Sequence, residues 1–258
     1  MPARNSPINA VQKACRILRS LVGPDASRLS EIANVTSLNK ATALRILDIL
    51  AREGFVEREE ATKSWSLGAE SYLLGTAASR RHNLRERARP SMVRLAAATS
   101  DTVLLSVRSG LEAVCVDREI GDYPIRANYL DIGSRRPLGI GAGSMALLAW
   151  LPDAEIEAVF TLIKPQLSNY PKITVKWLER EVEQCRVRGY ALVLNNIIPR
   201  MGGIGVPVLS TDGRPLAGLS IAALSERISP RLEELAATLR KEAQQITAPP
   251  SPKRSDKG

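Results

Sequence analysis

The chain has 258 residues, 44% of them hydrophobic and 24% charged, which is the composition of a soluble globular protein with room for two modest domains. No apolar run reaches about eighteen residues and no signal-peptide core opens the chain, so we expect no membrane span and a cytoplasmic protein. Three well-separated cysteines and a single histidine offer no disulfide framework, metal site or histidine-based catalysis. We expect no cofactor.

The net charge of +9 is unevenly distributed along the chain. Residues 1–90 hold 15 Lys and Arg against 9 Asp and Glu, whereas residues 91–258 hold 21 against 18. A charge that served only solubility would be spread more evenly. We therefore expect the first third of the chain to bind a polyanion such as DNA.

The first third shows the pattern of a winged helix-turn-helix domain. After a polar arm, a helix is predicted over residues 8–22, and its expected apolar face consists of Ile8, Val11, Ala14, Cys15, Leu18 and Val22. A short helix is then predicted over residues 30–36. A second, amphipathic helix begins at Lys40, because Asn39 is a good N-cap and Ala43, Leu44, Leu47 and Leu50 recur at helical spacing. Gly54 ends it, and two extended runs, residues 55–58 and 64–67, form the expected wing. Helix, turn, helix and wing in this order indicate DNA binding.

The second of these helices is expected to enter the major groove of DNA. Arg45 is the candidate for reading guanine, Thr42 or Lys40 for bases or phosphates, and Asn39 is expected to cap the helix first. Asp48 either accepts from cytosine or points at solvent. Residues on the wing would contact the DNA backbone. The full set of expected DNA-contacting residues is Ser37, Asn39, Lys40, Thr42, Ala43, Arg45, Arg58, Lys63 and Ser64.

The middle of the chain predicts a linker and then a second domain. A linker helix is expected in residues 69–83, with an apolar side that suits a dimer contact. A further helix over residues 84–99 contains Pro90, where we expect a kink or a fresh start. Runs rich in β-branched residues then predict an antiparallel meander of three strands, residues 102–107, 113–117 and 125–130.

The last part alternates helices and strands. A glycine-rich bend at residues 139–143 opens a helix that ends near Trp150, and residues 174–188 predict a helix capped by Gly189. Three more strands, residues 190–194, 204–210 and 215–223, precede a final helix that starts at Ser229. We assign residues 1–68 to a DNA-binding domain, 69–83 to the linker helix, 84–246 to an α+β antiparallel-sheet domain and 247–258 to a disordered tail.

Several of these stretches together resemble the isocitrate lyase regulator (IclR) family of bacterial transcription factors. In the first domain they are Leu29-Ser30-Glu31-Ile32-Ala33, residues 38–47, Gly54-Phe55-Val56 and Leu67-Gly68. In the second they are Pro137-Leu138, residues 143–149, Arg188-Gly189-Tyr190-Ala191, Gly205-Val206-Pro207-Val208 and Ala217-Gly218-Leu219-Ser220. The resemblance implies a GAF-like sensor fold for the second domain, a dimer or a dimer of dimers, a palindromic double-stranded DNA operator and a small organic acid as effector.

The resemblance also implies where the effector binds. The corresponding residues are Leu138, Ile140, Ala142, Gly143, Ser144, Val193, Gly203, Ser220 and Ala222. Val193 stands where the family often has an acidic residue and Gly203 where it often has a cysteine, so we expect a less polar and roomier cavity. A helix that starts at a glycine-rich bend presents free N–H groups and a positive dipole end, which suits a carboxylate.

Four other interpretations are considered, and three of them remain at this point. Gly141-Ala142-Gly143-Ser144-Met145-Ala146 matches a dinucleotide fingerprint formally, but no buried parallel strand precedes it and no acidic strand end follows, so we reject it. The chain could be an enzyme acting on a small carboxylate or phosphate compound with an appended helix-turn-helix, although it lacks a nucleophile elbow or phosphate loop. The second domain could also fill its own core and bind nothing, or the chain could be a pure interaction module.

Overall fold

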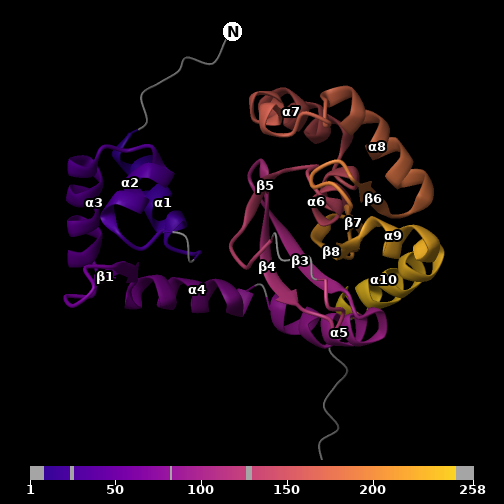
Figure 1. The fold of residues 1–258 in the computed structure, drawn as a ribbon, viewed down its shortest axis with the longest axis horizontal. Helices are drawn as coiled ribbons and strands as arrows, with labels where there is room; N and C mark the ends of the chain where they lie inside the picture. The colour runs from indigo at the N-terminus through magenta and orange to yellow at the C-terminus, as the bar shows by residue number, and fades with distance from the viewer. Residues whose placement is uncertain (1–8, 24–25, 82, 126–129, 248–258) are drawn as a thin grey trace, which may run out of the picture. The chain divides into compact units, whose positions relative to one another are not determined.

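The computed structural model describes residues 9–23, 26–81, 83–125 and 130–247. The expected N-terminal arm, nearly all of the expected C-terminal tail and the middle of the expected strand 125–130 lie outside these residues. Contacts divide the chain into two units, Met1–Asn83 and Leu84–Gly258, which are described separately (Figure 1). None of the described helices is long and apolar enough to cross a membrane.

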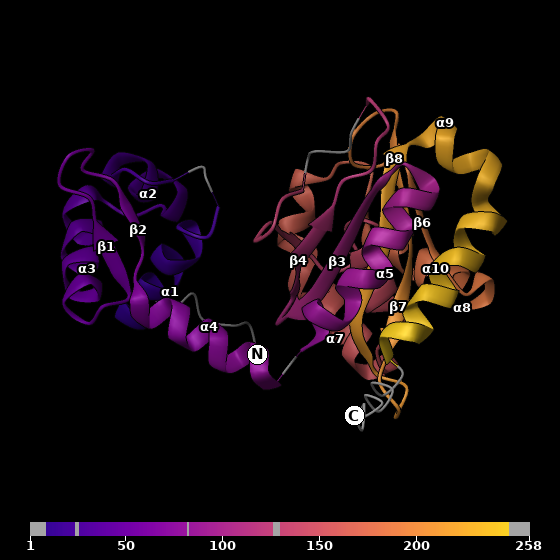
Figure 2. The same ribbon diagram turned by 90° about the horizontal axis from the view of Figure 1, so that it is seen from below.

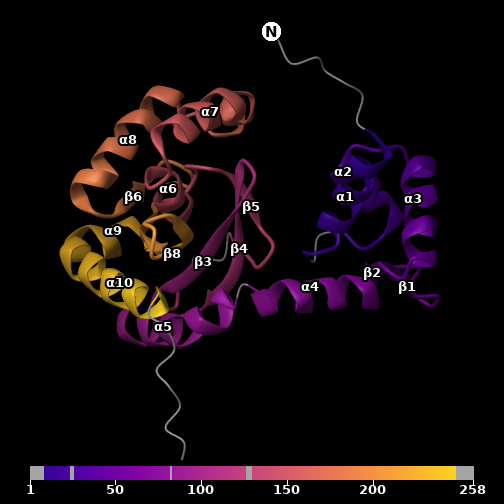
Figure 3. The ribbon, with the colours of Figure 1, turned by 180° about the vertical axis from the view of Figure 1, so that it is seen from behind.

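The first unit is a helical domain with a two-stranded hairpin (Figure 3). Its elements are α1 (Ala10–Ser20), α2 (Leu29–Thr36), α3 (Lys40–Arg52), β1 (Val56–Arg58), β2 (Trp65–Leu67) and α4 (Ala69–Arg81). The hairpin is antiparallel, and Glu57 lies opposite Ser66. Thus the helix, turn, helix and wing predicted from the sequence are confirmed, with ends that differ by a residue or two.

Local signals explain where these helices begin and end. Asn9 forms a capping box with Gln12, and the Asn39 side chain accepts from the Thr42 N–H at 2.8 Å, so α1 and α3 start where the sequence caps them. Ser37 takes a left-handed conformation, φ 56°, between α2 and α3, and Gly54 does the same, φ 73°, after α3. These two residues set the turn before the second helix and the entry into the wing.

The core of the first unit differs from the expected one at α1. Ile17 is fully buried and packs with Ile32, Leu47 and Trp65, whereas Val11 is 71% exposed. The predicted apolar face of α1 was rotated, because a short helix with apolar residues on several sides does not define its buried face by spacing alone.

The second unit contains helices on both faces of one sheet (Figure 2). Its helices are α5 (Leu84–Thr99), α6 (Ala142–Ala149), α7 (Asp153–Ile163), η1 (Lys164–Asn169), α8 (Val175–Arg188), α9 (Ser225–Ile228), η2 (Ser229–Arg231) and α10 (Leu232–Thr247). Its strands are β3 (Thr102–Ser109), β4 (Glu112–Glu119), β5 (Arg135–Pro137), β6 (Ala191–Leu194), β7 (Met201–Leu209) and β8 (Pro215–Leu224). The helix α5 runs through Pro90 without a fresh start.

The six strands form one antiparallel sheet in the order β5-β4-β3-β8-β7-β6. β3 and β4 are consecutive in the chain and pair with each other, whereas β8, which comes much later in the chain, pairs with the other edge of β3. The hairpin between β7 and β8 is confirmed at the predicted Asp212-Gly213 turn, where Gly213 has φ 79°. An α+β domain with an antiparallel sheet is therefore present, as the sequence predicted.

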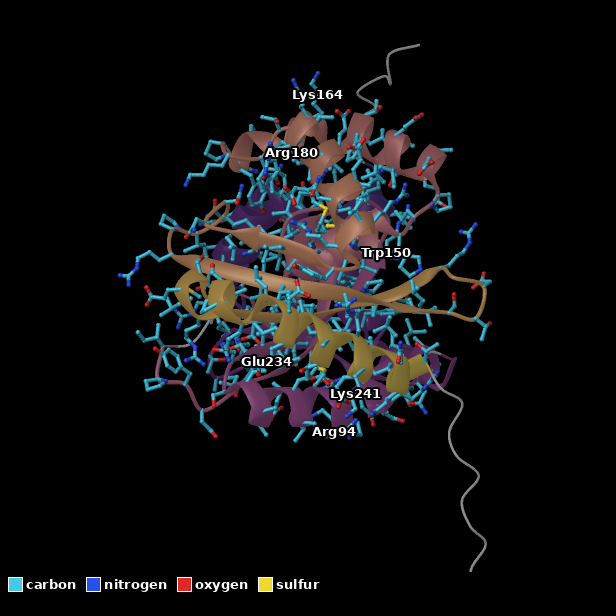
Figure 4. The ribbon with its side chains drawn as sticks, turned by 90° about the vertical axis from the view of Figure 1, so that its right-hand side faces the viewer. Arg94, Trp150, Lys164, Arg180, Glu234 and Lys241 are labelled. Carbon is cyan, nitrogen blue, oxygen red and sulfur yellow. The ribbon has the colours of Figure 1, made fainter. Side chains whose placement is uncertain are left out.

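Helices cover the two faces of this sheet differently. On one face α5 and α10 pack against the sheet through Met92, Leu95, Leu235 and Leu239. These helices are also joined at their outer edge, where Arg94 pairs with Glu242 at 2.5 Å. On the other face α6 lies directly on the strands, and α7 and α8 lie over α6 (Figure 1). Figure 4 shows Lys164 and Arg180 on the side of α7 and α8, and Glu234, Lys241 and Arg94 on the side of α10 and α5.

Glycines let α6 approach the sheet closely. A Cβ on Gly218 of β8 would lie 2.0 Å from the carbonyl oxygen of Gly143, and one on Gly205 of β7 would lie 2.9 Å from the carbonyl carbon of Ala142. Both contacts are with backbone, which cannot move aside as a flexible side chain can. The first turn of α6 is therefore held against the middle of the sheet by two positions that must lack a side chain.

Most of the third strand of the expected meander, residues 126–129, lies outside the described residues, and its two described ends, Ile125 and Leu130, are not in a strand. A strand that was not predicted, β5 at Arg135–Pro137, pairs with β4. A three-residue strand with two arginines carries little β-propensity, so its pairing with β4 rather than its composition defines it.

Candidate functional site

The exposed side of α3 carries the residues expected to read DNA. Lys40 and Arg45 are exposed, Thr42 is half-buried, and neither cation forms an ion pair with any described residue. Asn39 is exposed but its side-chain oxygen is used to cap α3. The structure corrects one expected contact: Ala43 is fully buried in the domain core, because it lies on the side of α3 that packs against α2, and its side chain cannot reach DNA.

A basic groove lies beside the start of α3. It has a volume of about 520 Å³ and is lined by Arg28, Leu29, Ser30, Lys40, Leu44, Arg58, Thr62, Lys63 and Trp65. The Arg58 guanidinium lies over the Trp65 ring, 5.4 Å from its centre, and both residues line the groove. Arg28 and Ser30 were missed by the sequence prediction. The sequence feature that could have identified them is their position at the N-terminus of the predicted short helix, where free backbone N–H groups attract phosphate.

At the tip of the wing, charges of both signs pair with one another. Lys63 Nζ lies 2.6 Å from Glu60 Oε2, and this contact holds the pKa of Glu60 below its ordinary value. The Ser64 hydroxyl lies 2.6 Å from the Thr62 hydroxyl and is half-buried, while Ser37 is exposed at the turn before α3. Lys63 is therefore accessible, but Glu60 partly neutralises its charge. The Ser64 hydroxyl is occupied by a contact within the wing.

The second unit contains a pocket, partly open to solvent, between the start of α6 and the sheet. Its walls come from β3, β4, β5, β6, β7, β8, the first turn of α6 and the connections before and after β5 and before β7. The lining residues are Leu104, Ser106, Ala113, Cys115, Leu130, Ser134, Arg136, Ile140, Gly141, Ala142, Gly143, Ser144, Val193, Ile197, Ile198, Met201, Gly202, Gly203, Ser220, Ile221 and Ala222. A water-sized sphere can occupy about 50 Å³ of it.

The polar groups of this pocket gather at the first turn of α6. Gly141, the N-cap residue, supplies no side-chain cap, so the first N–H groups of α6 have no side-chain acceptor there. Ser106 and Ser220 are 8% and 4% exposed, and neither hydroxyl has a hydrogen-bond partner among the described residues. A Cβ on Gly143 would lie 2.9 Å from Ser220 Oγ and 3.5 Å from Ser106 Oγ, so both hydroxyls lie beside this helix end.

The charge of the pocket is one-sided. Of the described residues that line it, Arg136 alone is charged, and none is an Asp or Glu. The positive end of the α6 dipole points into the same space. The arrangement is suited to bind an anion and offers no carboxylate pair for acid–base chemistry.

Eight of the nine residues implied for the effector line this pocket, and one does not. Leu138 is fully buried and packs with Met145, Leu147 and Leu178 in the core under α7 and α8, so its assignment is corrected. Ser144 lies at the pocket, but its hydroxyl already accepts from the Gly139 N–H at 3.0 Å and donates to the Pro137 carbonyl at 3.2 Å. The Ser144 hydroxyl thus stabilises the bend before α6 by hydrogen bonds.

Most residues that line the pocket are apolar, but the extra room predicted at Gly203 is absent. A Cβ on Gly203 would lie 3.1 Å from the Cβ of Ala142, so the missing side chain lets α6 and β7 touch instead of leaving a void. Ile197, Ile198 and Met201 from the connection into β7 also line the space. The prediction failed because a small residue at a wall creates volume only if its neighbours stay apart.

The sequence prediction missed part of this lining, including Ser106 and Arg136. Ser106 shares a face of β3 with Leu104 and lies opposite Gly218 of β8, so strand alternation could have identified it once the pairing was known. Arg136 lies on β5, the strand that was not predicted.

The two buried cysteines are not suited to nucleophilic chemistry, and the described parts of the chain hold no metal site. Burial raises the pKa of the Cys115 thiol to about 11, and burial likewise raises that of Cys185 to about 11, so both stay protonated near neutrality. No three His, Cys, Asp or Glu side chains in those parts come together as metal ligands would.

Two family models match the chain. Residues 10–60 match the IclR helix-turn-helix domain, and residues 76–248 match the bacterial transcriptional regulator IclR C-terminal domain. The HTH-type transcriptional regulator KipR of Bacillus subtilis is 29% identical over 92% of this chain and 95% of its own length.

Solved structures agree with this match. The IclR of Thermotoga maritima is 29% identical, covers 93% of this chain and 97% of its own, and superposes with a TM-score of 0.65. An IclR homologue from Microbacterium hydrocarbonoxydans, complexed with 4-hydroxybenzoate, is 24% identical, covers 93% of this chain and 98% of its own, and has a TM-score of 0.74. With both of its domains matched in order, the chain belongs to the IclR family of bacterial transcriptional regulators, which are not enzymes.

Proposed function

We propose that this regulator binds a small organic acid in the pocket at the start of α6, and that the bound acid changes its affinity for a palindromic operator. The observation that carries the proposal is the chemistry of the pocket. It combines the N-terminus of α6 with the Ser106 and Ser220 hydroxyls, and its described lining contains no acidic residue. Backbone N–H groups and hydroxyls of this kind bind a carboxylate well when they are shielded from water.

The remaining lining favours an acid with an apolar body. Leu104, Ala222 and Met201 belong to one apolar cluster in the lining, and Val193, which is 4% exposed, also lines the pocket. Each square ångström of apolar ligand surface removed from water contributes roughly 25 cal/mol, a gain that a two- or three-carbon keto acid would hardly use. The 4-hydroxybenzoate complex of the Microbacterium homologue supports the same class of ligand.

The small volume of the pocket supplies a link between binding and regulation. Pockets for such ligands measure roughly 300–1,000 Å³, several times the 50 Å³ present here, so the lining must move to admit an aromatic acid. A ligand that binds only the expanded form shifts the equilibrium between the two forms, whereas one with equal affinity for both would shift nothing.

On the DNA side, we propose that α3 enters the major groove, with Arg45 reading a guanine and Lys40 and Thr42 contacting bases or phosphates. Ser37, Arg58, Ser64 and Lys63 stay assigned to the DNA interface, with Arg28 and Ser30 added at the start of α2. Asn39 acts through its cap. A regulator of this kind works on chromosomal DNA, so its place is the cytoplasm.

A dimer, or a dimer of dimers, fits the exposed surface of α4. Tyr72, Leu73 and Leu74 are 74%, 55% and 58% exposed, an unusual number of large apolar side chains for a helix that faces only water. Pairing two copies through α4 would bury part of this apolar surface and present two α3 helices to the half-sites of a palindrome.

The test uses the full-length protein. A binding site is first selected from random double-stranded DNA, and its affinity is then measured by fluorescence anisotropy at several salt concentrations, with and without short keto, branched and aromatic acids. We expect a palindromic site, a steep salt dependence and a change of at least about tenfold in affinity with one of the larger acids. Should no acid alter binding to the selected site, the proposed role of the pocket is wrong.

A further inference from the structure

We propose that Arg136 makes the pocket selective for charge, so that it accepts a carboxylic acid and rejects the matching neutral amide; this rests on the proposed function. The α6 N–H groups and the two serine hydroxyls can hydrogen-bond to a neutral carbonyl as well as to a carboxylate. They therefore position a ligand without distinguishing its charge. Arg136 is the one charged group in the described lining.

Arg136 occupies the right place because of strand alternation. It lies on β5 opposite Ala113 of β4, another lining residue, and a Cβ on Gly141 would lie 3.6 Å from its terminal Nη1. The guanidinium therefore reaches the N-cap of α6. Its neighbour Arg135 lies on the other side of the strand, where its Nε and Nη2 donate at 2.8 Å to Glu112 and Ser109.

Two positive features meet at this helix end. The N-terminus of α6 carries about half a positive charge, and the guanidinium adds a full one in a half-buried position. An anionic ligand at this helix end interacts favourably with both positive features, whereas a neutral ligand of the same shape gains no such charge interaction. A guanidinium also matches a carboxylate with two parallel N–H groups, which a single ammonium cannot do.

The experiment compares acids with their primary amides, which have nearly the same shape. Benzoate, 4-hydroxybenzoate, phenylacetate and 3-methylbutanoate, each paired with its amide, are titrated by ligand-detected NMR into full-length protein. The proteins are the wild type, Arg136→Met, Arg136→Lys and the control Arg135→Met, which removes a neighbouring arginine that does not line the pocket. Melting curves and circular dichroism show whether each variant is folded.

We expect the wild type to bind at least one acid at least about tenfold more tightly than its amide, the range that charge-assisted hydrogen bonds produce. Arg136→Met should bring this ratio close to one, Arg136→Lys should keep part of it, and Arg135→Met should keep all of it. A loss of the preference for acids over amides in Arg136→Met, with the preference unchanged in Arg135→Met, supports the proposal. If Arg136→Met does not fold, the ratio in Arg136→Lys decides, and an unchanged ratio there overturns the proposal.

The outcomes also separate this inference from the function on which it rests. If acids bind the wild type and the preference over amides survives in Arg136→Met, Arg136 has no selective role although the pocket does bind acids. If the wild type binds no acid of the panel better than its amide, both this inference and the proposed class of effector are wrong.

Discussion

The exposed side of α3, which we propose binds DNA, and the pocket at the start of α6, which we propose binds the effector, are opposite kinds of surface. On α3 the candidate groups are long charged side chains, Lys40 and Arg45, that stand in solvent on a helix whose other side is buried. In the pocket the candidate groups are backbone N–H groups and two serine hydroxyls, enclosed by strands from across the domain. One surface is complete in a single helix, whereas the other exists only after the whole sheet has formed.

This difference determines how each surface tolerates change. A side chain on the exposed face of α3 can be removed with little effect on the fold, because few neighbours depend on it. The pocket depends on contacts of backbone with backbone at Gly205 and Gly218, so changes there act on stability and binding together. Substitutions that separate folding from binding are thus easy to find on α3 and rare in the pocket.

The largest effect is expected where α6 meets the sheet. Gly218→Ala would place a Cβ 2.0 Å from the carbonyl oxygen of Gly143, and we expect a loss of about 3 kcal/mol or more from the free energy of unfolding of the second domain. Denaturant unfolding followed by the fluorescence of Trp150 and Trp177 measures it. The control Gly75→Ala, in α4 with nothing within 4 Å, should be neutral or stabilise by roughly 0.5–1 kcal/mol. Equal stability of the two variants would refute the close approach of α6.

The next effect concerns recognition by α3. Arg45→Ala should lose base preference at one or two positions of each half-site, at a cost of about 1–3 kcal/mol, while Arg52→Ala, exposed at the end of the same helix, should leave the preference unchanged. Competition binding against single-base variants of the selected operator gives the result. An unaltered preference in Arg45→Ala would exclude the proposed docking of α3.

The same contrast explains which parts of these two surfaces could be predicted from the sequence. Asn39, Gly54 and the period of α3 are local signals, so the recognition helix and the wing were located within a residue or two. The glycine-rich bend located the start of α6 equally well. However, β5 and therefore Arg136 were missed, because that strand exists through pairing with β4 alone. The size of the pocket was also mispredicted, since only the fold shows that Gly203 touches Ala142.

A smaller effect should separate two serines of the pocket. Ser220 has no hydrogen-bond partner in the described part of the chain, so Ser220→Ala should weaken binding of an acid by about 1 kcal/mol and leave the melting temperature nearly unchanged. Ser144 braces the bend before α6 through Pro137 and Gly139, so Ser144→Ala should lower the stability of the second domain. Calorimetric titration and melting curves on both variants compare the two roles, and a reversed pattern would contradict the assignment.

The smallest effect is expected at the tip of the wing. Lys63 is exposed, but Glu60 partly neutralises its charge, because Lys63 Nζ lies 2.6 Å from Glu60 Oε2. Lys63→Ala should therefore weaken binding to all DNA sequences alike. The dependence of affinity on salt concentration should fall by less than one full phosphate contact contributes. Glu60→Gln should strengthen binding to all DNA sequences and increase the salt dependence, because it removes a negative charge near DNA and the ion pair that neutralises Lys63.

The hydrogen bond from Lys63 lowers the pKa of Glu60, so the carboxylate stays ionised throughout the neutral range. The effects of both substitutions should therefore not vary with pH in that range. Anisotropy titrations of both variants at several salt concentrations measure the slopes, and tighter binding by Lys63→Ala would show that the wing tip is not a phosphate contact.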